Sequence, residues 1–170
     1  MLRLKGPYHQ IEVYDVDTYS ILRYVTVPYL QGFCDLTSCA YYHCLYVADY
    51  GLRCVHRPDL QGVTRWAVND IPTGLSVNKA HNVLVTCTYR KIKEFRSNGI
   101  LLREVRLPDD FITPWYAIEL TTGQFVACHG NLGDDIRRVC VTSADGTLLH
   151  EHGGQPGSCL LYTSPSPRDS

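Results

Sequence analysis

The sequence predicts an all-β protein built from a repeated unit of about 40 residues. Apolar runs begin at Leu45, Val83 and Phe125, and each is followed by a polar break and a second strand-like run. Hydrophobic residues make up 45% of the chain and charged residues 19%, which is typical of a globular protein. Short β-rich runs recur, whereas helical periodicity is missing. Four short strands in a unit of this length are typical of a β-propeller blade.

Each of three complete units offers four predicted strands. In the first complete unit the strands are expected at residues 35–40, 45–49, 53–57 and 64–68. In the next they are expected at 74–77, 83–87, 91–95 and 101–107. In the last they are expected at 116–120, 125–129, 137–142 and 147–152. Gly62, Gly99 and Gly146 precede the fourth strand of each unit, where a tight hairpin needs a positive φ.

The unit that precedes these three is expected to be incomplete. Residues 11–16 and 21–27 read as two strands joined by a turn at Asp17 and Thr18. We predict that they are the two outer strands of a blade whose inner strands are missing. The chain would then hold about three and a half four-stranded blades of a partial β-propeller.

The end of the chain departs from this pattern. Residues 159–169 closely resemble one reading frame of the transposase mosaic-end adapter used in sequencing libraries, and their Ser and Pro content is typical of a disordered segment. We therefore predict two parts, a partial propeller over residues 1–158 and an adapter-derived disordered tail over 159–170. The gene product is expected to continue beyond Ser158.

The repeated motif resembles the NHL-repeat β-propellers, including the tripartite-motif/NHL-like proteins. The likeness is carried by residues 45–49, 53–57 with 59–62, 74–77, 139–141 and 145–146. The resemblance implies a six-bladed ring in which N-terminal outer strands complete the C-terminal blade. Because that partner lies beyond the adapter-like segment, we expect an open ring with an exposed edge strand. We also expect that this part of the chain is not stable alone.

Charge and hydropathy limit the cellular locations and the classes of binding partner that the sequence allows. Sixteen basic and seventeen acidic residues give a net charge of -1, so a global basic field for nucleic acid is absent. No apolar run approaches the roughly 18 residues of a membrane span. The N-terminus lacks the apolar core of a secretory signal. The sequence therefore predicts a cytoplasmic protein without a membrane partner.

The eight cysteines form no CxxC pair. Cys39, His43 and Cys44 lie close together in sequence, but a closed tetrahedral site is hard to complete from one strand end and a turn. We interpret the cysteines as buried small hydrophobic residues in a reducing compartment. No disulfides, no metal site and no cofactor are predicted.

Three residues occupy equivalent positions at the ends of second strands, namely Asp49, Cys87 and His129. Propeller pseudosymmetry would bring such positions around one axis, so they are candidates for the mouth of the channel. Some six-bladed hydrolases and lyases place metal ligands close to such a channel. An enzyme of this type is one alternative, and the simpler interpretation is that these residues cap strand ends or face solvent.

A basic rim is a second candidate site. Basic residues stand at the entry to each third strand, together with one aromatic ring: Arg53, Tyr89, Arg90, Lys91, Lys93, Arg137 and Arg138. Charge plus a stacking aromatic suits single-stranded RNA, and some NHL propellers bind RNA on a basic face. The competing interpretation is a solvated rim partly offset by Glu94, Asp134 and Asp135.

Large aromatic residues could anchor a protein partner. Trp66, Trp115, Tyr41 and Tyr42 are candidates, and packing between blades is the alternative. No catalytic fingerprint occurs, and the paired Cys/His pattern of a RING ubiquitin ligase is absent, so no catalytic residue is predicted. We predict a non-catalytic scaffold that presents propeller loops to a protein. RNA binding is the first alternative, and a propeller hydrolase or lyase is the second.

Overall fold

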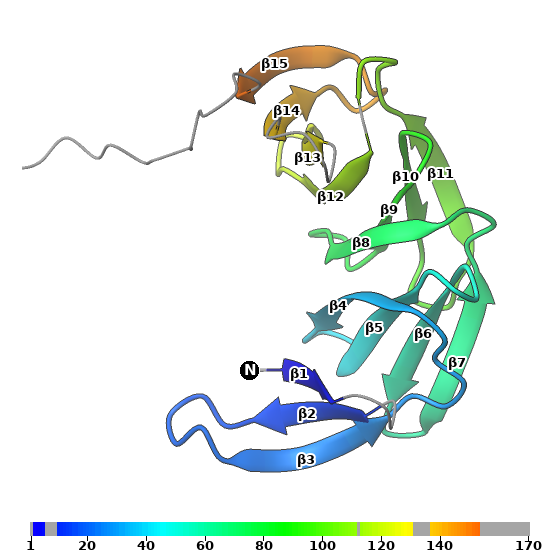
Figure 1. Ribbon diagram of the computed structural model, residues 1–170, viewed down its shortest axis with the longest axis vertical. Coiled ribbons are helices and arrows are strands. Elements are labelled where there is room, and N and C mark those ends of the chain that lie inside the picture. The colour runs from blue at the N-terminus through cyan, green and yellow to red at the C-terminus, as the bar shows by residue number, and fades with distance from the viewer. Residues whose placement is uncertain (1, 6–9, 112, 131–136, 154–170) are drawn as a thin grey trace, which may run out of the picture.

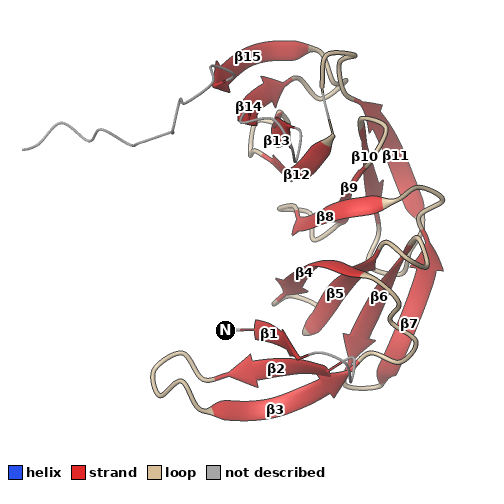
Figure 2. Ribbon diagram, in the orientation of Figure 1, coloured by secondary structure: helices blue, strands red, loops and turns tan. Residues whose placement is uncertain are grey.

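The computed structural model describes residues 2–5, 10–111, 113–130 and 137–153. Within these ranges every regular element is a β-strand, and the strands form four antiparallel sheets (Figures 1 and 2). The sheets follow one another along an open arc (Figure 1). The prediction of an all-β fold is confirmed.

We call the four sheets blades 1 to 4, in chain order. Blade 1 contains β1 (Leu2–Lys5), β2 (Gln10–Tyr14) and β3 (Ile21–Thr26). Blade 2 contains β4 (Phe33–Cys39), β5 (Cys44–Asp49), β6 (Cys54–Asp59) and β7 (Gly62–Ala67). Blade 3 contains β8 (Pro72–Val77), β9 (Val83–Cys87), β10 (Lys91–Phe95) and β11 (Leu101–Arg106). Blade 4 contains β12 (Pro114–Glu119), β13 (Phe125–Gly130), β14 (Arg137–Thr142) and β15 (Leu148–Gly153).

Each blade is a meander in which consecutive strands pair. The first strands of blades 2 to 4 lie on the concave side of the arc, where β8 contacts both β4 and β12 (Figure 1). Hydrogen bonds join these inner strands across one repeat. The Leu75 amide donates to Oδ2 of Asp35 at 2.7 Å, and the Ser76 hydroxyl donates to the Ala117 carbonyl at 2.7 Å. Neighbouring blades are therefore fixed at their inner edges.

The hydrophobic core lies between the blades. A large cluster fills the space between blades 2 and 3 and includes Tyr46, Val85 and Phe95. A second cluster around Phe125 packs blade 3 against blade 4. The cluster between blades 1 and 2 is smaller, with Ile11, Val27, Leu30 and Val47 fully or almost fully buried. Because both faces of a middle blade are covered, its central strands are apolar on both sides.

Gly99 and Gly146 precede the fourth strands of their blades as predicted, and Gly62 is the first residue of β7. Gly62, Gly99 and Gly146 have φ values of 146°, 86° and 95°, which are confirmed as positive. A Cβ on Gly99 would lie 2.7 Å from Cγ of Trp66 in the preceding blade. Trp66 itself packs against the core between blades 2 and 3, which agrees with the alternative that it packs between blades.

The prediction for blade 1 needs a correction. We expected only two outer strands, but β1 adds a third strand that pairs with β2. The run Leu2–Lys5 is too short for its alternation to stand out in the sequence. In blade 2 the third strand begins at Cys54, which leaves Arg53 in the preceding turn. The tail predicted from residue 159 lies outside the described residues.

No described helix is long and apolar enough to cross a membrane.

Candidate functional site

The predicted basic rim lies at the turns between second and third strands and at the start of the third strands. Arg53, Tyr89 and Arg90 occupy such turns with φ values of 50°, 61° and 62°. This left-handed conformation is uncommon for residues other than Gly. Tyr89 is 71% exposed. Arg53 is also exposed.

The two lysines of the rim are already neutralised. Nζ of Lys93 lies 2.7 Å from Oδ2 of Asp70 and donates to the Val68 carbonyl at 2.8 Å. Nζ of Lys91 lies 3.2 Å from both Asp70 and Glu104. Burial raises the pKa of Asp70, but hydrogen bonds from both lysines outweigh it and hold the pKa below its ordinary value. Lys93 is buried, so it cannot contact a partner.

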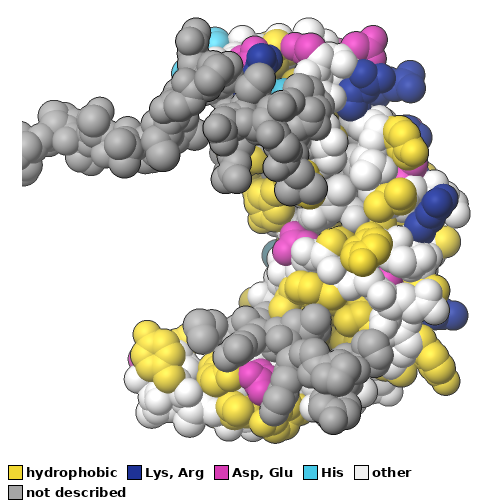
Figure 3. Space-filling model, viewed as in Figure 1, with side chains coloured by type: hydrophobic (Ala, Val, Ile, Leu, Met, Phe, Trp, Pro, Cys, Tyr) yellow, Lys and Arg dark blue, Asp and Glu magenta, His cyan; other side chains and the backbone are white. Residues whose placement is uncertain are grey.

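Two arginines of the rim also have acidic partners. Arg90 pairs with Asp109 at 3.1 Å, and Arg138 pairs with Glu151 at 2.7 Å. The side chain of Arg137 lies outside the described part of the structure. On the face seen in Figure 3, Lys and Arg side chains are scattered along the convex side and form no continuous patch. Among the described rim residues, Arg53 and Tyr89 are the exposed ones.

Asp49, Cys87 and His129 lie at equivalent ends of second strands, as expected, but their side chains are buried. Their proposed place at the channel mouth remains a prediction. Asp49 and His129 face the segment that connects the preceding blade to their own. Asp49 accepts hydrogen bonds from the Gln31 and Gly32 amides at 2.9 Å. The His129 ring stacks on Phe111 with a centroid distance of 4.1 Å.

Burial suppresses acid–base and thiolate chemistry at these positions. It raises the pKa of Cys87 to about 12 and lowers the pKa of His129. Both side chains are therefore neutral near pH 7, and Cys87 is not an activated nucleophile. Burial also raises the pKa of Asp49, but hydrogen bonds from backbone amides and His56 bring it below its ordinary value.

These positions belong to a polar site that recurs at each blade junction. We call this the junction site. It consists of a residue at the end of the second strand and the residues at the start of the third strand that lie opposite or beside it. It comprises Asp49, Cys54 and His56 in blade 2; Cys87, Lys91 and Lys93 in blade 3; and His129, Arg138 and Cys140 in blade 4. The sequence analysis missed His56 and Cys140. The signal that could have found them is the two-residue spacing from Cys54 and Arg138, which places both members of a pair on one strand face.

The opposite rim carries an aromatic cluster. Tyr41 and Tyr42 lie in the turn between β4 and β5, and His81 lies in the turn between β8 and β9. The Tyr41 and His81 rings are stacked with centroids 4.2 Å apart and planes 5° apart. Tyr42 meets Tyr41 edge-on at 4.9 Å. Tyr41 remains 65% exposed and Tyr42 40% exposed, so two neighbouring blades present one aromatic surface.

Trp115 has a partly structural role. Its indole nitrogen donates to the Gly130 carbonyl at 3.0 Å, and 37% of the side chain is exposed.

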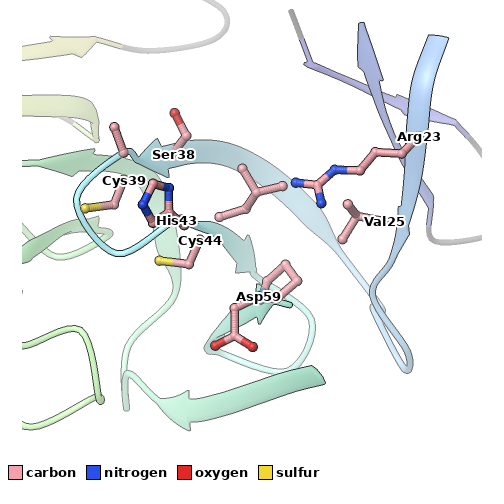
Figure 4. Close-up of a pocket in the computed structure, with 10 residues that line it drawn as sticks. Arg23, Val25, Ser38, Cys39, His43, Cys44 and Asp59 are labelled. Carbon is pink, nitrogen blue, oxygen red and sulfur yellow. The ribbon is translucent and has the colours of Figure 1, made fainter. Parts of the chain in front are cut away.

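A pocket of about 240 Å³ opens where blade 1 meets the β4–β5 hairpin (Figure 4). Arg23 reaches from β3 towards this hairpin, while Cys39, His43 and Cys44 line the hairpin side (Figure 4). Asp59, at the end of β6, also lines the pocket (Figure 4). Cys39 and Cys44 are directly paired across β4 and β5. All seven described cysteines are free.

Several solved structures share this fold but have distant sequences. Hydrazine synthase from Kuenenia stuttgartiensis matches with a TM-score of 0.68 and 19% identity, over 85% of this chain and 43% of that one. A catalytically inactive virginiamycin B lyase from Staphylococcus aureus matches with a TM-score of 0.65 and 12% identity, over 92% and 55%. A streptogramin B lyase matches with a TM-score of 0.64 and 14% identity, over 89% and 49%.

The fold is that of a β-propeller. The chain spans about half the length of these structures, with shares of 43%, 55% and 49%. At these identities the likeness concerns the fold alone. No family model matches the chain, and no curated protein matches its sequence.

Proposed function

We propose that the protein is a non-catalytic scaffold of the NHL propeller type that binds a protein partner in the cytoplasm. The observation that carries the proposal is the cluster of exposed Tyr41 and Tyr42 with the half-buried His81. Aromatic residues contribute large contact areas at low entropic cost and are enriched among binding hot spots. Turns on rigid sheets are the usual places for such residues.

The paired charges favour this proposal over RNA binding. Phosphate recognition depends on cations that are free to replace counterions. Arg90, Lys91, Lys93 and Arg138 each have an acidic partner within 3.2 Å. A hydrolase or lyase activity is supported by the fold of the lyase neighbours alone, and the raised pKa of the buried thiols argues against nucleophilic cysteines.

The scaffold can be tested with the full chain as a tagged bait. Wild type, Tyr41→Ala/Tyr42→Ala and Tyr19→Ala are compared by quantitative mass spectrometry of captured proteins. Tyr19 is the matched control because it is 69% exposed and lies in blade 1, away from the cluster. A specific partner should be retained by wild type and the control and lost by the double variant. Equal capture by all three would contradict the proposal.

RNA binding is tested with a fluorescein-labelled single-stranded RNA and anisotropy at several salt concentrations. Arg53→Glu and Arg90→Glu are the informative variants, because substitution of the buried Lys93 would disturb the fold. Tight binding with a steep salt dependence that both variants reduce would move RNA binding ahead of the scaffold.

A further inference from the structure

The junction site of blade 2 brings three different ligand atoms together. One carboxylate oxygen of Asp49, Sγ of Cys54 and one ring nitrogen of His56 all lie within 4.8 Å of one another. Nε2 of His56 is 3.2 Å from Oδ2 of Asp49 and 3.4 Å from Sγ of Cys54. The three residues are 0%, 5% and 1% exposed.

The strand register creates this convergence. Asp49 at the end of β5 lies directly opposite Cys54 at the start of β6. His56 follows two residues later on β6, so its side chain shares a sheet face with Cys54. The site is thus made by two adjacent strands and needs no distant segment.

Hydrogen bonding alone leaves the three groups imperfectly matched. A neutral imidazole nitrogen is either a donor or an acceptor, never both. If Nε2 donates to the Asp49 carboxylate, it cannot also accept the Cys54 thiol proton, and the sulfur is left as a weak second acceptor of the same N–H. If it accepts from Cys54, its lone pair cannot bond the carboxylate at 3.2 Å. A cation bonded to all three atoms removes this conflict.

We propose that Asp49, Cys54 and His56 bind one Zn²⁺ ion. Carboxylate oxygen, imidazole nitrogen and thiolate sulfur are the ligands that zinc takes in proteins, and three protein ligands leave the fourth tetrahedral position for water. On binding, the Cys54 thiol releases its proton to solvent as the Zn–S bond forms, with no change in oxidation state.

The surrounding backbone orients the carboxylate. Oδ2 of Asp49 accepts a hydrogen bond from the Gln31 amide, and Oδ1 accepts from the Gly32 and Leu52 amides at 2.9 and 3.0 Å. Such outer hydrogen bonds hold ligands in place in metal sites. They also connect the proposed ion to the segment that links blade 1 to blade 2.

Blade 3 supplies independent support from the equivalent position. There the chain places its own cation, the Lys93 ammonium, whose residue is 5% exposed. It is bound by Asp70 at 2.7 Å, by Glu104 at 3.5 Å and by the Val68 carbonyl at 2.8 Å. The junction site of blade 3 therefore holds the positive charge of Lys93. The junction site of blade 2 has no such side chain and presents ligands that could bind a metal cation.

We assign no metal to the second cluster, which is His129, Cys140 and Glu151 in blade 4. Nε2 of His129 is 3.1 Å from Sγ of Cys140 but 4.0 Å from Glu151. Glu151 is bound by Arg138 at 2.7 Å, which competes with a metal. Cys140 therefore offers a matched control, because it is a buried thiol beside a histidine in an equivalent site.

The test is a Co²⁺ titration of the full chain under reducing conditions. Cobalt replaces zinc, and a thiolate ligand gives a sulfur-to-cobalt charge-transfer band. We expect one equivalent of Co²⁺ to produce the band and Zn²⁺ to bleach it. Cys54→Ser should abolish the band, His56→Gln should weaken the affinity at least tenfold, and Cys140→Ser should leave both unchanged.

A second measurement needs no substitution. Zn²⁺ should raise the thermal unfolding midpoint of wild type, a chelator should reverse the rise, and Cys54→Ser should not respond. Circular dichroism establishes that each variant folds. Absence of the charge-transfer band in folded wild type, its persistence in Cys54→Ser, or its loss in Cys140→Ser would overturn the proposal.

Discussion

The junction between blades 2 and 3 and the junction between blades 1 and 2 use one backbone arrangement with opposite chemistry. In the former, the Lys93 ammonium of blade 3 meets the Asp70 carboxylate from the connecting segment. In the latter, the Asp49 carboxylate of blade 2 meets the amides of Gln31 and Gly32. The repeated fold thus fixes where a polar group is buried, and the side chains decide its charge.

The two junctions also differ in apolar packing. Blades 2 and 3 share an extensive cluster that contains Tyr46, Phe95 and the adjoining Trp66. Blades 1 and 2 share only a small one. Gly99 packs tightly on Trp66, whereas a Cβ on Gly62 would meet nothing within 4 Å. We therefore expect substitutions to cost more at the junction of blades 2 and 3.

The largest expected effect is that of Lys93→Met. Removal of the ammonium leaves Asp70 without its closest cation and the Val68 carbonyl without its donor, in a largely buried site. Breaking one partner of a buried ion pair costs about 3–5 kcal/mol of unfolding free energy. Urea unfolding measures the loss, with the exposed Lys79→Met as the control. A loss below about 1 kcal/mol would show that the junction does not depend on this charge.

The paired substitutions Gly99→Ala and Gly62→Ala compare the two junctions at the hairpin turn. Both residues have a positive φ, which costs a non-Gly residue about 1 kcal/mol or more. Gly99→Ala also forces its Cβ against Trp66, so we expect a loss of about 2–3 kcal/mol. Gly62→Ala should lose about 1 kcal/mol. Equal losses in thermal unfolding would rule out a contribution from the Trp66 contact.

Val85→Ala and Val47→Ala test the apolar difference at equivalent positions. Val85 lies opposite Lys93 and Val47 lies opposite His56, and both are fully buried. Two lost methyl groups cost about 0.8 kcal/mol each, and a cavity adds to this when neighbours cannot collapse. We expect about 2 kcal/mol for Val85 and about 1 kcal/mol for Val47. A reversed order in denaturant unfolding would contradict the comparison.

The smallest effect is a dependence of stability on acidic pH. The folded-state pKa of Asp70 lies below its ordinary value of 3.8. Its contribution is therefore fully present above pH 3.8 and is lost as the pH falls through the lower folded-state pKa. Urea midpoints from pH 7 downward should show this slope. Asp70→Asn should reduce it, and Lys93→Met should reduce it in the same direction.

The sequence predicts the repeat and most strands because hydrophobic runs and Gly turns recur at one period. It does not predict the junction sites, because their contacts depend on the register between strands and on the neighbouring blade. Lys93 illustrates the limit. A lysine in a charged stretch reads as a solvated side chain, yet its alternate position in β10 directs it towards blade 2.

The candidate rim shows a similar division. The turn positions of Tyr89 and Arg90 follow from the predicted hairpins, whereas Arg53 was expected in the strand and lies in the turn. The ion pair of Arg90 with Asp109 could not be read from sequence, because the two residues approach only after a strand and a connector have folded. Burial of Asp49, Cys87 and His129 depends in the same way on connecting segments that cover the strand ends.

The junction sites also favour one order of the blades, because the groups of each connecting segment match the junction site of only one blade. In the first connector, backbone amides donate hydrogen bonds to the Asp49 carboxylate. In the second, the Asp70 carboxylate binds the Lys93 amine, and in the third the Phe111 ring stacks on His129. An exchange of blades 2 and 3 would separate the Lys93 ammonium from Asp70 and place it against the Gln31 and Gly32 amides, which are donors and cannot bind a cation. Repeats of near-identical shape risk docking on the wrong neighbour during folding, and mismatched charges penalise that error.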